Sequence, residues 1–433
     1  MTLKFFKSWQ QFGFLALVGL LLSWLISCGT PASNNSSTSG AKQVEFWTMQ
    51  LQPKFTDYFN QLIAQFEKEN PDVKIRWVDV PWEAMQRKIL TAVSAKTAPD
   101  VVNLNPDFAS QLAARNAWLD LDRKITSEQK AEYLPKIWQA GTLGGKSFGI
   151  PWYLTSRVAI YNQALLKQAG VTTPPKTFTE LAQVAKQVKD QTGKYAFFTT
   201  VVPEDSAEVM ESFVQMGVQL VDQQGKAAFN TPAGKAAFQY WTDLYKQGLV
   251  PPEVLTEGHR YAVELYQSGR TGILASGPEF LNAIATNAPD VAKVSSSAPQ
   301  ITGETGKKNV AVMNLLIPRD TDQPEMAVKF ALFVTNSQNQ LAFAKAANVL
   351  PSNVKALADQ FFTAAPANAT PVEQARVVSA AQMKDAQVLV PPLKNVKQLQ
   401  KVIYDNLQAA MLGQKTVDQA IADAAKEWDQ RSS

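Results

Sequence analysis

Short apolar segments alternate with amphipathic helix patterns from Val44 onward, and this alternation constrains the fold more than any other feature of the chain. Residues 44–47 and 73–80 have the apolar content of strands. Between them, apolar residues recur at helical spacing over residues 55–66, which indicates one buried helix face. Pro71 ends that helix. This order predicts an α/β fold with a largely parallel sheet and helices on both of its faces.

Further elements follow the same order along the chain. Residues 85–93 repeat an apolar helix pattern, and residues 101–104 form a third short apolar segment. Thr177 followed by Glu180 has the spacing of a capping box, so a helix is predicted to begin there. Additional helices are predicted over three longer segments, residues 232–247, 324–345 and 396–412.

The length of the chain indicates more than one domain. Its 433 residues exceed what one ordinary hydrophobic core accommodates. Hydrophobic residues make up 45% of the chain and charged residues 18%, as in globular proteins. No internal repeat and no long linker interrupts residues 43–433. Two lobes, if present, are therefore joined by ordinary segments that cross between them.

Charge and the content of metal-binding residues exclude several kinds of partner. The formal net charge is +4, with two of the positive charges on Lys4 and Lys7, and no run of lysine or arginine forms a basic stripe. Nucleic acid is therefore not expected as a partner. One cysteine and one histidine exclude an internal disulfide and a metal site made of several cysteines or histidines. We expect neither a metal nor a cofactor.

The first 28 residues have the pattern of an export signal. Lys4 and Lys7 precede the uncharged segment Phe12–Ile26, which is shorter than the roughly 20 residues that a spanning helix needs. The block Leu25-Ile26-Ser27-Cys28 resembles a bacterial lipobox, in which the cysteine becomes the lipidated first residue of the mature protein. The alternative is a signal anchor in which Cys28 has no role. Residues 28–42 are mostly small and polar, as in a flexible tether.

Several blocks between residues 144 and 189 together resemble one protein family. They are Gly145-Lys146, Gly149-Ile150-Pro151, Tyr161-Asn162, Ala169-Gly170 and the helix start Pro174–Leu181. In this order they are similar to the bacterial extracellular solute-binding proteins that deliver sugars to ABC importers, the group of the maltose-binding protein. Further blocks, among them "GRTGILASGPEF" and "GQKTVDQAIADAAKEW", extend the resemblance over nearly all of residues 43–430.

The resemblance implies a particular domain organisation. The expected fold is the two-lobed periplasmic-binding-protein type of class II, with the ligand cleft between the lobes. The chain is then expected to cross between the lobes near residues 153–157, 299–302 and 348–352. The expected parts are a signal peptide (1–27), a lipid-anchored linker (28–42), an N-terminal lobe (43–154 plus 300–347) and a C-terminal lobe (155–299 plus 348–433).

Candidate ligand contacts follow from the chemistry of sugars. A sugar has flat C–H faces, which aromatic rings cover, and a rim of hydroxyls, which polar groups satisfy. In open α/β sheets the ligand lies beyond the carboxyl ends of the strands. Residues of these types at predicted strand ends, at the first crossing, or in blocks where the family places contacts are Trp47, Gln50, Trp82, Glu83, Asn105, Asp107, Trp152, Tyr153, Arg157, Glu204, Glu279, Phe280 and Asn314.

Some of these candidates have a second interpretation. Trp47 fits a core position equally well, and Asp107 is also placed to cap a helix. Arg157 is alternatively one half of an ion pair between lobes. The Gly277-Pro278 block often continues with tryptophan in the family, whereas Glu279 follows here, so stacking from that position is in doubt. His259 is interpreted as a surface residue, and five tryptophans are assigned to packing: Trp77, Trp118, Trp138, Trp241 and Trp428.

The resemblance implies a function without covalent chemistry. The chain is expected to be the monomeric substrate-binding component of an ABC importer that captures a mono- or oligosaccharide, or a glycosylated polyol, and passes it to permease subunits. Its expected location is the outer face of the bacterial cytoplasmic membrane, held by a lipid anchor. Two alternatives stay open: a secreted hydrolase that uses a pair of carboxylates, and a sensory module that presents its ligand to a membrane receptor.

The lipid anchor gives the first testable prediction. Replacing Cys28 with serine removes the thiol that would carry the lipid, so Cys28→Ser is expected to release the protein from membranes. Cell fractionation followed by immunoblotting measures the release. Ligand affinity is expected to stay unchanged, because Cys28 lies before the tether. Membrane association that survives the substitution would contradict the anchor.

Overall fold

The computed structural model describes residues 41–113, 115–203, 205–390, 393 and 395–432, so the predicted signal peptide, Cys28 and Glu204 lie outside the described residues. The strands are β1 (Lys42–Met49), β2 (Val73–Val80), β3 (Val101–Leu104), β4 (Thr142–Leu143), β5 (Lys146–Ser147), β6 (Gly149–Thr155), β7 (Val158–Asn162), β8 (Ile273–Ser276), β9 (Ser295–Ala298), β10 (Lys308–Asn309), β11 (Ala311–Leu316), β12 (Leu350–Pro351) and β13 (Ala386–Gln387).

The helices come mostly between these strands. They are α1 (Thr56–Glu69), α2 (Trp82–Ser94), α3 (Pro106–Ala113), α4 (Ser127–Ala131), α5 (Pro135–Trp138), α6 (Gln163–Gln168), α7 (Phe178–Thr192), α8 (Glu208–Gln215), α9 (Pro232–Lys246), α10 (His259–Gln267), α11 (Phe280–Asn287), α12 (Pro289–Lys293), α13 (Pro324–Val334), α14 (Ser337–Ala347), α15 (Val354–Leu357), α16 (Gln360–Thr363), α17 (Pro371–Ala381), α18 (Val396–Met411) and α19 (Val417–Arg431). Short 3₁₀ turns are η1 (Leu121–Arg123), η2 (Gln139–Gly141), η3 (Pro252–Leu255) and η4 (Gln382–Lys384).

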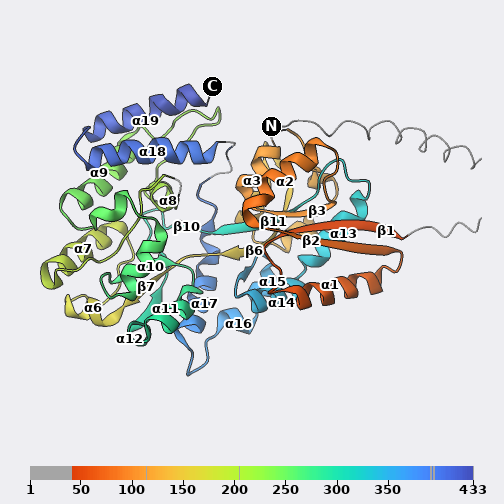
Figure 1. Ribbon diagram of the computed structural model, residues 1–433, viewed down its shortest axis with the longest axis horizontal. Coiled ribbons are helices and arrows are strands. Elements are labelled where there is room, and N and C mark those ends of the chain that lie inside the picture. The colour runs from red at the N-terminus through yellow and green to blue at the C-terminus, as the bar shows by residue number, and fades with distance from the viewer. Residues whose placement is uncertain (1–40, 114, 204, 391–392, 394, 433) are drawn as a thin grey trace, which may run out of the picture. The chain divides into compact units, whose positions relative to one another are not determined.

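Among the described residues, six strands form one sheet, here called sheet A, in the order β12-β6-β11-β3-β1-β2. One of its faces is covered by α1, α13 and α14, which bury Phe59, Phe330 and Phe343 against it. The other face is covered by α2 and α3, which bury Met85 and Leu112. The sequence prediction of helices on both faces of the sheet is thus confirmed for sheet A, which with these helices forms lobe A (Figure 1).

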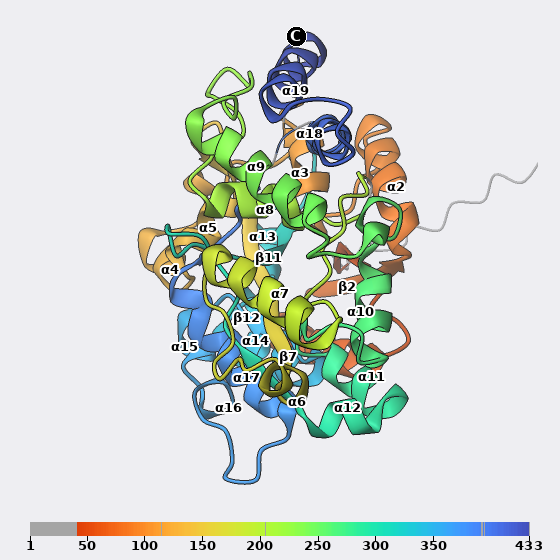
Figure 2. The ribbon, with the colours of Figure 1, turned by 90° about the vertical axis from the view of Figure 1, so that its left-hand side faces the viewer.

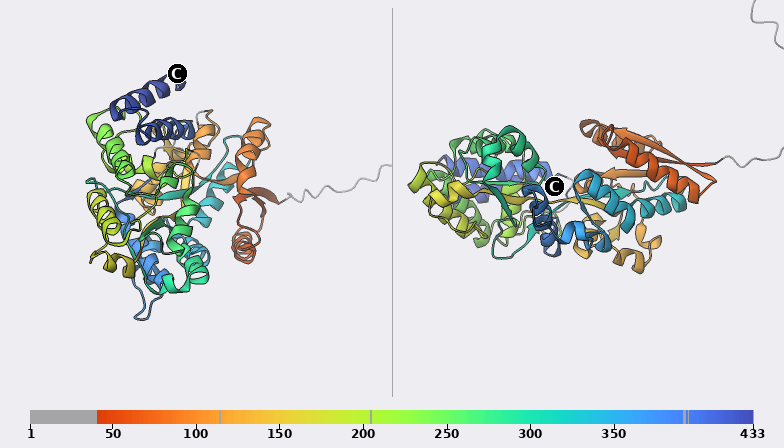
Figure 3. Two further views of the ribbon diagram at one scale, coloured as in Figure 1. Left: turned by 60° about the vertical axis from the view of Figure 1, so that its left-hand side comes forward. Right: turned by 90° about the horizontal axis from the view of Figure 1, so that it is seen from below.

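A second sheet, sheet B, has the order β8-β7-β9 in the described part of the chain. Its core includes residues from α7, α8, α9, α10, α18 and α19, and we call this group lobe B. Figure 2 has lobe B toward the viewer, with α7 and α10 in front. Figure 3 shows the helices of lobe A gathered around sheet A and those of lobe B around sheet B. Two separate hydrophobic cores therefore form, as the length of the chain predicts.

The expectation of largely parallel sheets is correct for only part of the structure. Strand β1 pairs in parallel with β2 and β3, as predicted for strands linked by helices. However, β11 is antiparallel to both β3 and β6, and β7 is antiparallel to β8 and β9. The reason in sheet A is the path of the chain. Strand β6 leads out of lobe A and β11 leads back into it, so the two must run in opposite directions.

The segments between the lobes follow from the strand pairing. The first crossing is Ser156–Arg157, between β6 in sheet A and β7 in sheet B. The second is residues 299–310, between β9 in sheet B and β11 in sheet A. Figure 1 shows the segments of β6 and β10 running between the two groups of elements.

The third crossing lies later in the chain than residues 348–352, where it was expected. Leu350 and Pro351 pair with β6, so the chain is still in sheet A at this point. Ser352 is held there too, because its hydroxyl donates to the carbonyl of Pro151 at 2.7 Å. The crossing is made instead by α17, which contributes Ala375 to the core of lobe B and Ala380 to an apolar cluster with Leu154 and Leu350 of lobe A.

The single helix predicted over residues 324–345 is two helices, α13 and α14. Asn336 lies between them in an extended conformation, and its side-chain oxygen accepts from the backbone N–H of Asn339 at 2.8 Å. An asparagine in this role begins a new helix. The preceding Thr335 donates to the carbonyl of Ala331 at 2.8 Å and contacts the hydroxyl of Tyr133 at 2.6 Å. By contrast, the predicted capping box of Thr177 and Glu180 is confirmed.

A close contact at the start of α9 gives a stability prediction. A β carbon on Gly234 would lie 1.8 Å from the carbonyl oxygen of Phe229. Overpacking of this kind typically costs about 1–3 kcal/mol, so Gly234→Ala is expected to lower the free energy of unfolding in urea titrations followed by circular dichroism. At an open helix position the same change stabilises by about 1 kcal/mol. The exposed neighbour Ala236, changed to glycine, measures that propensity effect alone. A stabilising Gly234→Ala would show that the contact is absent.

Candidate ligand-binding site

The carboxyl ends of four strands meet at one edge of sheet A. Strand β1 is parallel to β2 and β3, and β6 has the same direction because both β3 and β6 are antiparallel to β11. The carboxyl end of β6 leads directly into the first crossing toward lobe B. The edge at which ligands bind in open α/β sheets is therefore the edge of lobe A nearest the crossings.

The turn after β1 is ordered by one carboxylate. Asp79 accepts from the hydroxyl of Thr48 at 2.6 Å and from the backbone N–H groups of Leu51 and Gln52 at 3.0 Å. Gln50 precedes these residues with φ of 53°, and its side chain is exposed. Asp79 thus fixes the backbone from which Gln50, a predicted contact, extends into solvent.

Two aromatic rings lie at the turns after β2 and β3. Trp82 is the first residue of α2 and is 41% exposed, the most of any described tryptophan. Its ring centroid lies 6.0 Å from that of Phe108 in the first turn of α3, with the planes tilted by 47°. Glu83 follows Trp82 and is also exposed. The structure thus brings an aromatic surface and a carboxylate together at this edge of the sheet.

The start of α3 adds two polar residues to the same region. The side-chain oxygen of Asn105 accepts from the backbone N–H of Phe108 at 2.8 Å and so caps the helix. Asp107 is half-buried, and burial raises the pKa of its carboxyl group, with Lys397 of α18 partly opposing the shift. Asn105 therefore caps this helix, and the carboxylate of Asp107 does not.

Three predicted contacts lie in the interior of lobe A. Trp152 is fully buried and stacks on Phe343, with ring centroids 4.8 Å apart. Trp47 is 5% exposed and lies beneath the ammonium group of Lys88, which is 4.1 Å from its ring centroid. Asn314 is fully buried in the middle of β11, and neither polar atom of its amide has a hydrogen-bond partner among the described residues. The structure does not bring these three side chains to the edge.

Tyr153 lies between the interior and the edge. It is half-buried against Trp152 and Phe343, with ring centroids 5.0 and 5.3 Å away. Burial raises the pKa of its hydroxyl, and the nearby charge of Asp79 raises it further. The hydroxyl therefore stays protonated over the whole physiological range and is able to donate a hydrogen bond.

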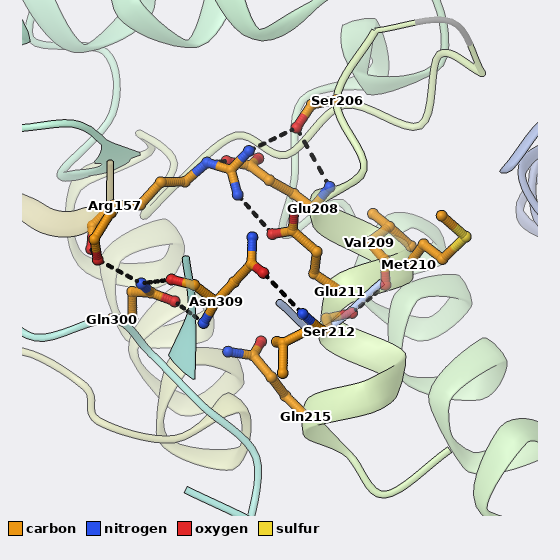
Figure 4. A network of polar contacts seen from close by, with 12 residues as sticks. Arg157, Ser206, Glu208, Val209, Met210, Glu211, Ser212, Gln215, Gln300 and Asn309 are labelled. Carbon is orange, nitrogen blue, oxygen red and sulfur yellow. Dashed lines mark hydrogen bonds and ion pairs between the residues drawn. The ribbon is translucent and has the colours of Figure 1, made fainter. Parts of the chain in front are cut away.

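The corresponding wall of lobe B is formed around Arg157. Its Nε lies 3.1 Å from Oε1 of Glu208, and its Nη1 lies 2.6 Å from Oε2 of Glu211, as Figure 4 shows. Burial opposes the charge of Arg157, but the carboxylates of Glu211 and Glu208 outweigh it and raise its pKa. Burial also raises the pKa of Glu211. Both partners belong to α8, so these ion pairs lie within lobe B rather than between the lobes.

His259 extends this wall. Its Nδ1 lies 3.8 Å from Oε1 of Glu208, and its Nε2 lies 3.2 Å from the hydroxyl of Ser276. Phe280 meets its ring edge-on at 6.1 Å. The expectation that His259 is a surface residue is met only in part, since its side chain is 25% exposed and contacts Glu208, Ser276 and the predicted contact Phe280.

Glu279 lies close to the first crossing segment. It is exposed, and it lines a small cavity of about 20 Å³. The other walls come from Thr155 at the end of β6, Ser156 of the first crossing, Asn348 after the end of α14 and Arg376 of α17. The cavity therefore has walls from both lobes and from the helix that connects them.

Sequence reasoning missed Glu208, Glu211 and His259. The two glutamates are spaced i, i+3 in the largely apolar segment Glu208–Gln215, and this spacing places them on one face of a helix. Acids on the buried face of an amphipathic helix were the available signal. For His259 the sequence gave no comparable signal, because its partners Glu208 and Ser276 are far from it in the chain.

Two sheets with separate cores, three crossings and polar strand ends at the crossing edge define a periplasmic-binding-protein type fold. The chain belongs to a family with this fold: the family described as bacterial extracellular solute-binding protein matches residues 52–341. The resemblance seen in the sequence is thereby confirmed, and the protein is an exported solute-binding protein. No helix in the described part of the chain has the length and apolar character to cross a bilayer.

Several individual proteins are similar over most of the chain. A proposed oligosaccharide periplasmic-binding protein of Synechococcus sp. MITs9220 has a solved structure with 46% identity and a TM-score of 0.84, covering 90% of this chain and 98% of that one. The diacetylchitobiose-binding protein of Streptomyces coelicolor is 24% identical over 94% of this chain and 95% of its own length. The cyclic α-maltosyl-1,6-maltose-binding protein of Arthrobacter globiformis shares the fold, with 21% identity, a TM-score of 0.76 and coverage of 91% and 99%.

The arrangement of the site suits reversible binding of an uncharged polar ligand. Carboxylates are present on both walls and amides on the wall of lobe A, and the described residues contain no group of three or more metal-binding side chains. Aromatic rings cover apolar ligand faces, and ionised carboxylates accept hydrogen bonds from hydroxyls.

The different positions of two tryptophans give a prediction. Trp82→Ala is expected to weaken ligand binding about tenfold and to remove most of the ligand-induced fluorescence change, without lowering the melting temperature. Trp152→Ala is expected to lower the free energy of unfolding by about 3–5 kcal/mol, since it empties a core position. Isothermal titration calorimetry and thermal unfolding separate the two effects. Unchanged affinity in Trp82→Ala would place the ligand away from the Trp82–Phe108 surface.

Proposed function

We propose that this protein captures a sugar between lobes A and B and delivers it to the permease subunits of an ABC importer. The observation that carries the proposal is the exposed Trp82 beside Phe108 at the carboxyl edge of sheet A. An exposed aromatic surface between carboxylates is what a sugar face requires. Two similar proteins, which are described as binding oligosaccharides and diacetylchitobiose, support the same class of ligand.

The contacts that we propose come from both lobes. In lobe A they are Gln50, Trp82, Glu83, Asn105, Asp107 and Tyr153. In lobe B they are Arg157, Glu279 and Phe280, together with Glu204, which lies outside the described residues. Trp47, Trp152 and Asn314 are proposed to support the wall of lobe A from behind, because they are buried where a ligand does not reach.

The balance of charge favours a neutral sugar over an acidic one. Lobe A presents Glu83 and Asp107, and lobe B presents Glu279. The guanidinium of Arg157 is already shared between Glu208 and Glu211. A uronic acid or a phosphorylated sugar would therefore bring its negative charge near several carboxylates, while Arg157 already has two carboxylate partners. Neutral hydroxyls, in contrast, donate to these carboxylates.

Capture is proposed to occur by closure of the lobes. The open form keeps the two walls apart, and a ligand that contacts both walls lowers the free energy of the closed form, which shifts the population toward it. We propose the lobes as residues 43–154 with 300–347 and residues 155–299 with 348–433, modified so that β12 stays with lobe A and α17 makes the third crossing.

We also propose that the protein is a monomer, that Cys28 carries a lipid which holds it at the outer face of the cytoplasmic membrane, and that it binds its ligand without chemical turnover. Glu83 and Asp107 belong to lobe A and Glu279 to lobe B. A hydrolytic pair drawn from both lobes would form only on closure, and this possibility is separated from simple binding by the experiment below.

A thermal-shift screen over neutral, acidic and amino sugars tests the function. A ligand that binds only the folded state at one hundred times its Kd stabilises by about 2.7 kcal/mol. We expect neutral oligosaccharides to raise the melting temperature by several degrees and the matching uronic acids to leave it unchanged. Chromatography of each stabilising sugar after long incubation is expected to recover it intact. Hydrolysis products, or stabilisation by acidic sugars alone, would contradict the proposal.

A further inference from the structure

The three crossings between the lobes meet in one hydrogen-bonded cluster. It consists of Ser156 and Arg157 from the first crossing, Gln300 and Asn309 from the second, and Gln382, which directly follows α17 in the third. We call these five residues the crossing cluster. Gln382 is 3% exposed and Ser156 is 5% exposed, so the contacts at its centre are shielded from water. Figure 4 shows Gln300 and Asn309 beside Arg157.

Gln382 joins the third crossing to the other two. Its side-chain nitrogen donates to the hydroxyl of Ser156 at 2.6 Å and to the backbone carbonyl of Arg157 at 2.7 Å. Its side-chain oxygen accepts from the backbone N–H of Gln300 at 3.1 Å. One amide therefore binds main-chain or hydroxyl groups of both other crossings, and all of these contacts link residues that are far apart in the sequence.

Gln300 links the two ends of the second crossing by hydrogen bonds and also contacts the first crossing. Its side-chain oxygen accepts from the backbone N–H of Asn309 at 2.9 Å, and its nitrogen donates to the carbonyl of Asn309 at 2.7 Å. The same nitrogen also lies 3.1 Å from the hydroxyl of Ser156. The two ends of the second crossing are thus held together by a side chain where no strand ladder joins them.

Asn309 connects this cluster to the wall of the cleft. Its side chain partly offsets the burial that raises the pKa of the Glu211 carboxyl group, and its Oδ1 accepts from the backbone N–H of Leu389 at 3.2 Å. Glu211 in turn holds the guanidinium of Arg157 at 2.6 Å. The position of Arg157, a proposed ligand contact, therefore depends on the same residues that join the crossings.

We propose that the crossing cluster is the fixed pivot of lobe closure, and that Gln300, Asn309 and Gln382 are positioning residues for sugar capture. This rests on the proposed function, in which the lobes close on a sugar. The first two crossings are single chain segments with many backbone torsions, and the third is the helix α17. Without a common anchor these three connections are free to move independently of one another. Hydrogen bonds from the buried amide of Gln382 and the partly buried amide of Gln300 leave one shared axis of rotation, so both walls meet in one register when the lobes close.

A pivot of this kind affects ligand affinity because it sets the fraction of closed forms in which the two walls are correctly aligned. If loosening the pivot lowers the fraction of closed forms with the correct register to about one tenth, the apparent Kd rises about tenfold with no ligand contact changed. The spread of distances between the lobes in the sugar-free protein rises at the same time. This second effect does not involve a ligand at all.

The test uses Gln382→Met, which keeps the shape of the side chain and removes its hydrogen bonds. Spin labels are placed on exposed positions of the two lobes by Gln61→Cys on α1 and Ala236→Cys on α9, in the exported protein carrying Cys28→Ser. Dipolar spectroscopy of the sugar-free protein is expected to give a broader distance distribution for Gln382→Met than for the parent. A thermal titration with the best sugar from the screen is expected to show the tenfold loss of affinity.

A matched control comes from Gln408 of α18. Its side-chain nitrogen donates to the carbonyls of Val201 at 2.9 Å and Leu255 at 3.3 Å, all within lobe B. Gln408→Met is expected to lower the melting temperature by about as much as Gln382→Met does. It is expected to leave the distribution of distances between the lobes narrow. An equally narrow distribution in Gln382→Met, or equal broadening in both variants, overturns the proposed pivot.

Ser156→Ala repeats the measurement if Gln382→Met does not fold, because it removes only the shared hydroxyl. Broadening without any sugar binding in the parent protein would leave the pivot standing and refute the proposed function. Sugar binding by the parent protein, combined with narrow distance distributions in the variants, would support the proposed function and refute the pivot.

Discussion

The antiparallel pairing of β6 with β11 is the constraint on which the arrangement of the site depends. Strand β6 carries the chain out of sheet A and β11 returns it. Their opposite directions give β6 the same direction as β1, β2 and β3, so the residues that follow these strands share the edge that leads to lobe B. The aromatic and acidic residues after β2 and β3 are thus brought to the crossings by topology. No contact among those residues themselves is needed to place them there.

The local part of this structure was predictable from the sequence, and the non-local part was not. The stripe that became α1 and the capping box of α7 depend on residues within one or two helical turns. The break between α13 and α14 also has a local cause in Asn336, which the apolar pattern concealed. In contrast, the pairing of β12 with β6 joins residues about 200 positions apart, and no pattern near Leu350 announces it.

The candidate site divides in the same way. Trp82 follows a proline at the end of a strand, and such a position is difficult to bury, so its exposure agrees with the sequence pattern. Trp152 and Asn314 were also predicted as contacts but lie within β6 and β11 and are fully buried, because α1 and α14 cover one face of sheet A and α3 the other. Residue type at a strand end therefore identifies candidates, whereas the helices that cover the sheet decide which of them reach solvent.

A solute-binding protein of this kind needs a rigid binding wall and lobes that can rotate, and Arg157 takes part in both. A guanidinium shared by two carboxylates in a partly buried position is expensive to disturb, since removal of one partner leaves an uncompensated charge. It therefore holds α8 against the first crossing whatever the lobes do. Because the backbone carbonyl of Arg157 also accepts from Gln382, any rotation of lobe B about the crossings must carry α8, and the wall around it, as one body. The ion pair makes the wall rigid, and the amide hydrogen bonds of the crossing cluster hold the axis about which that wall turns.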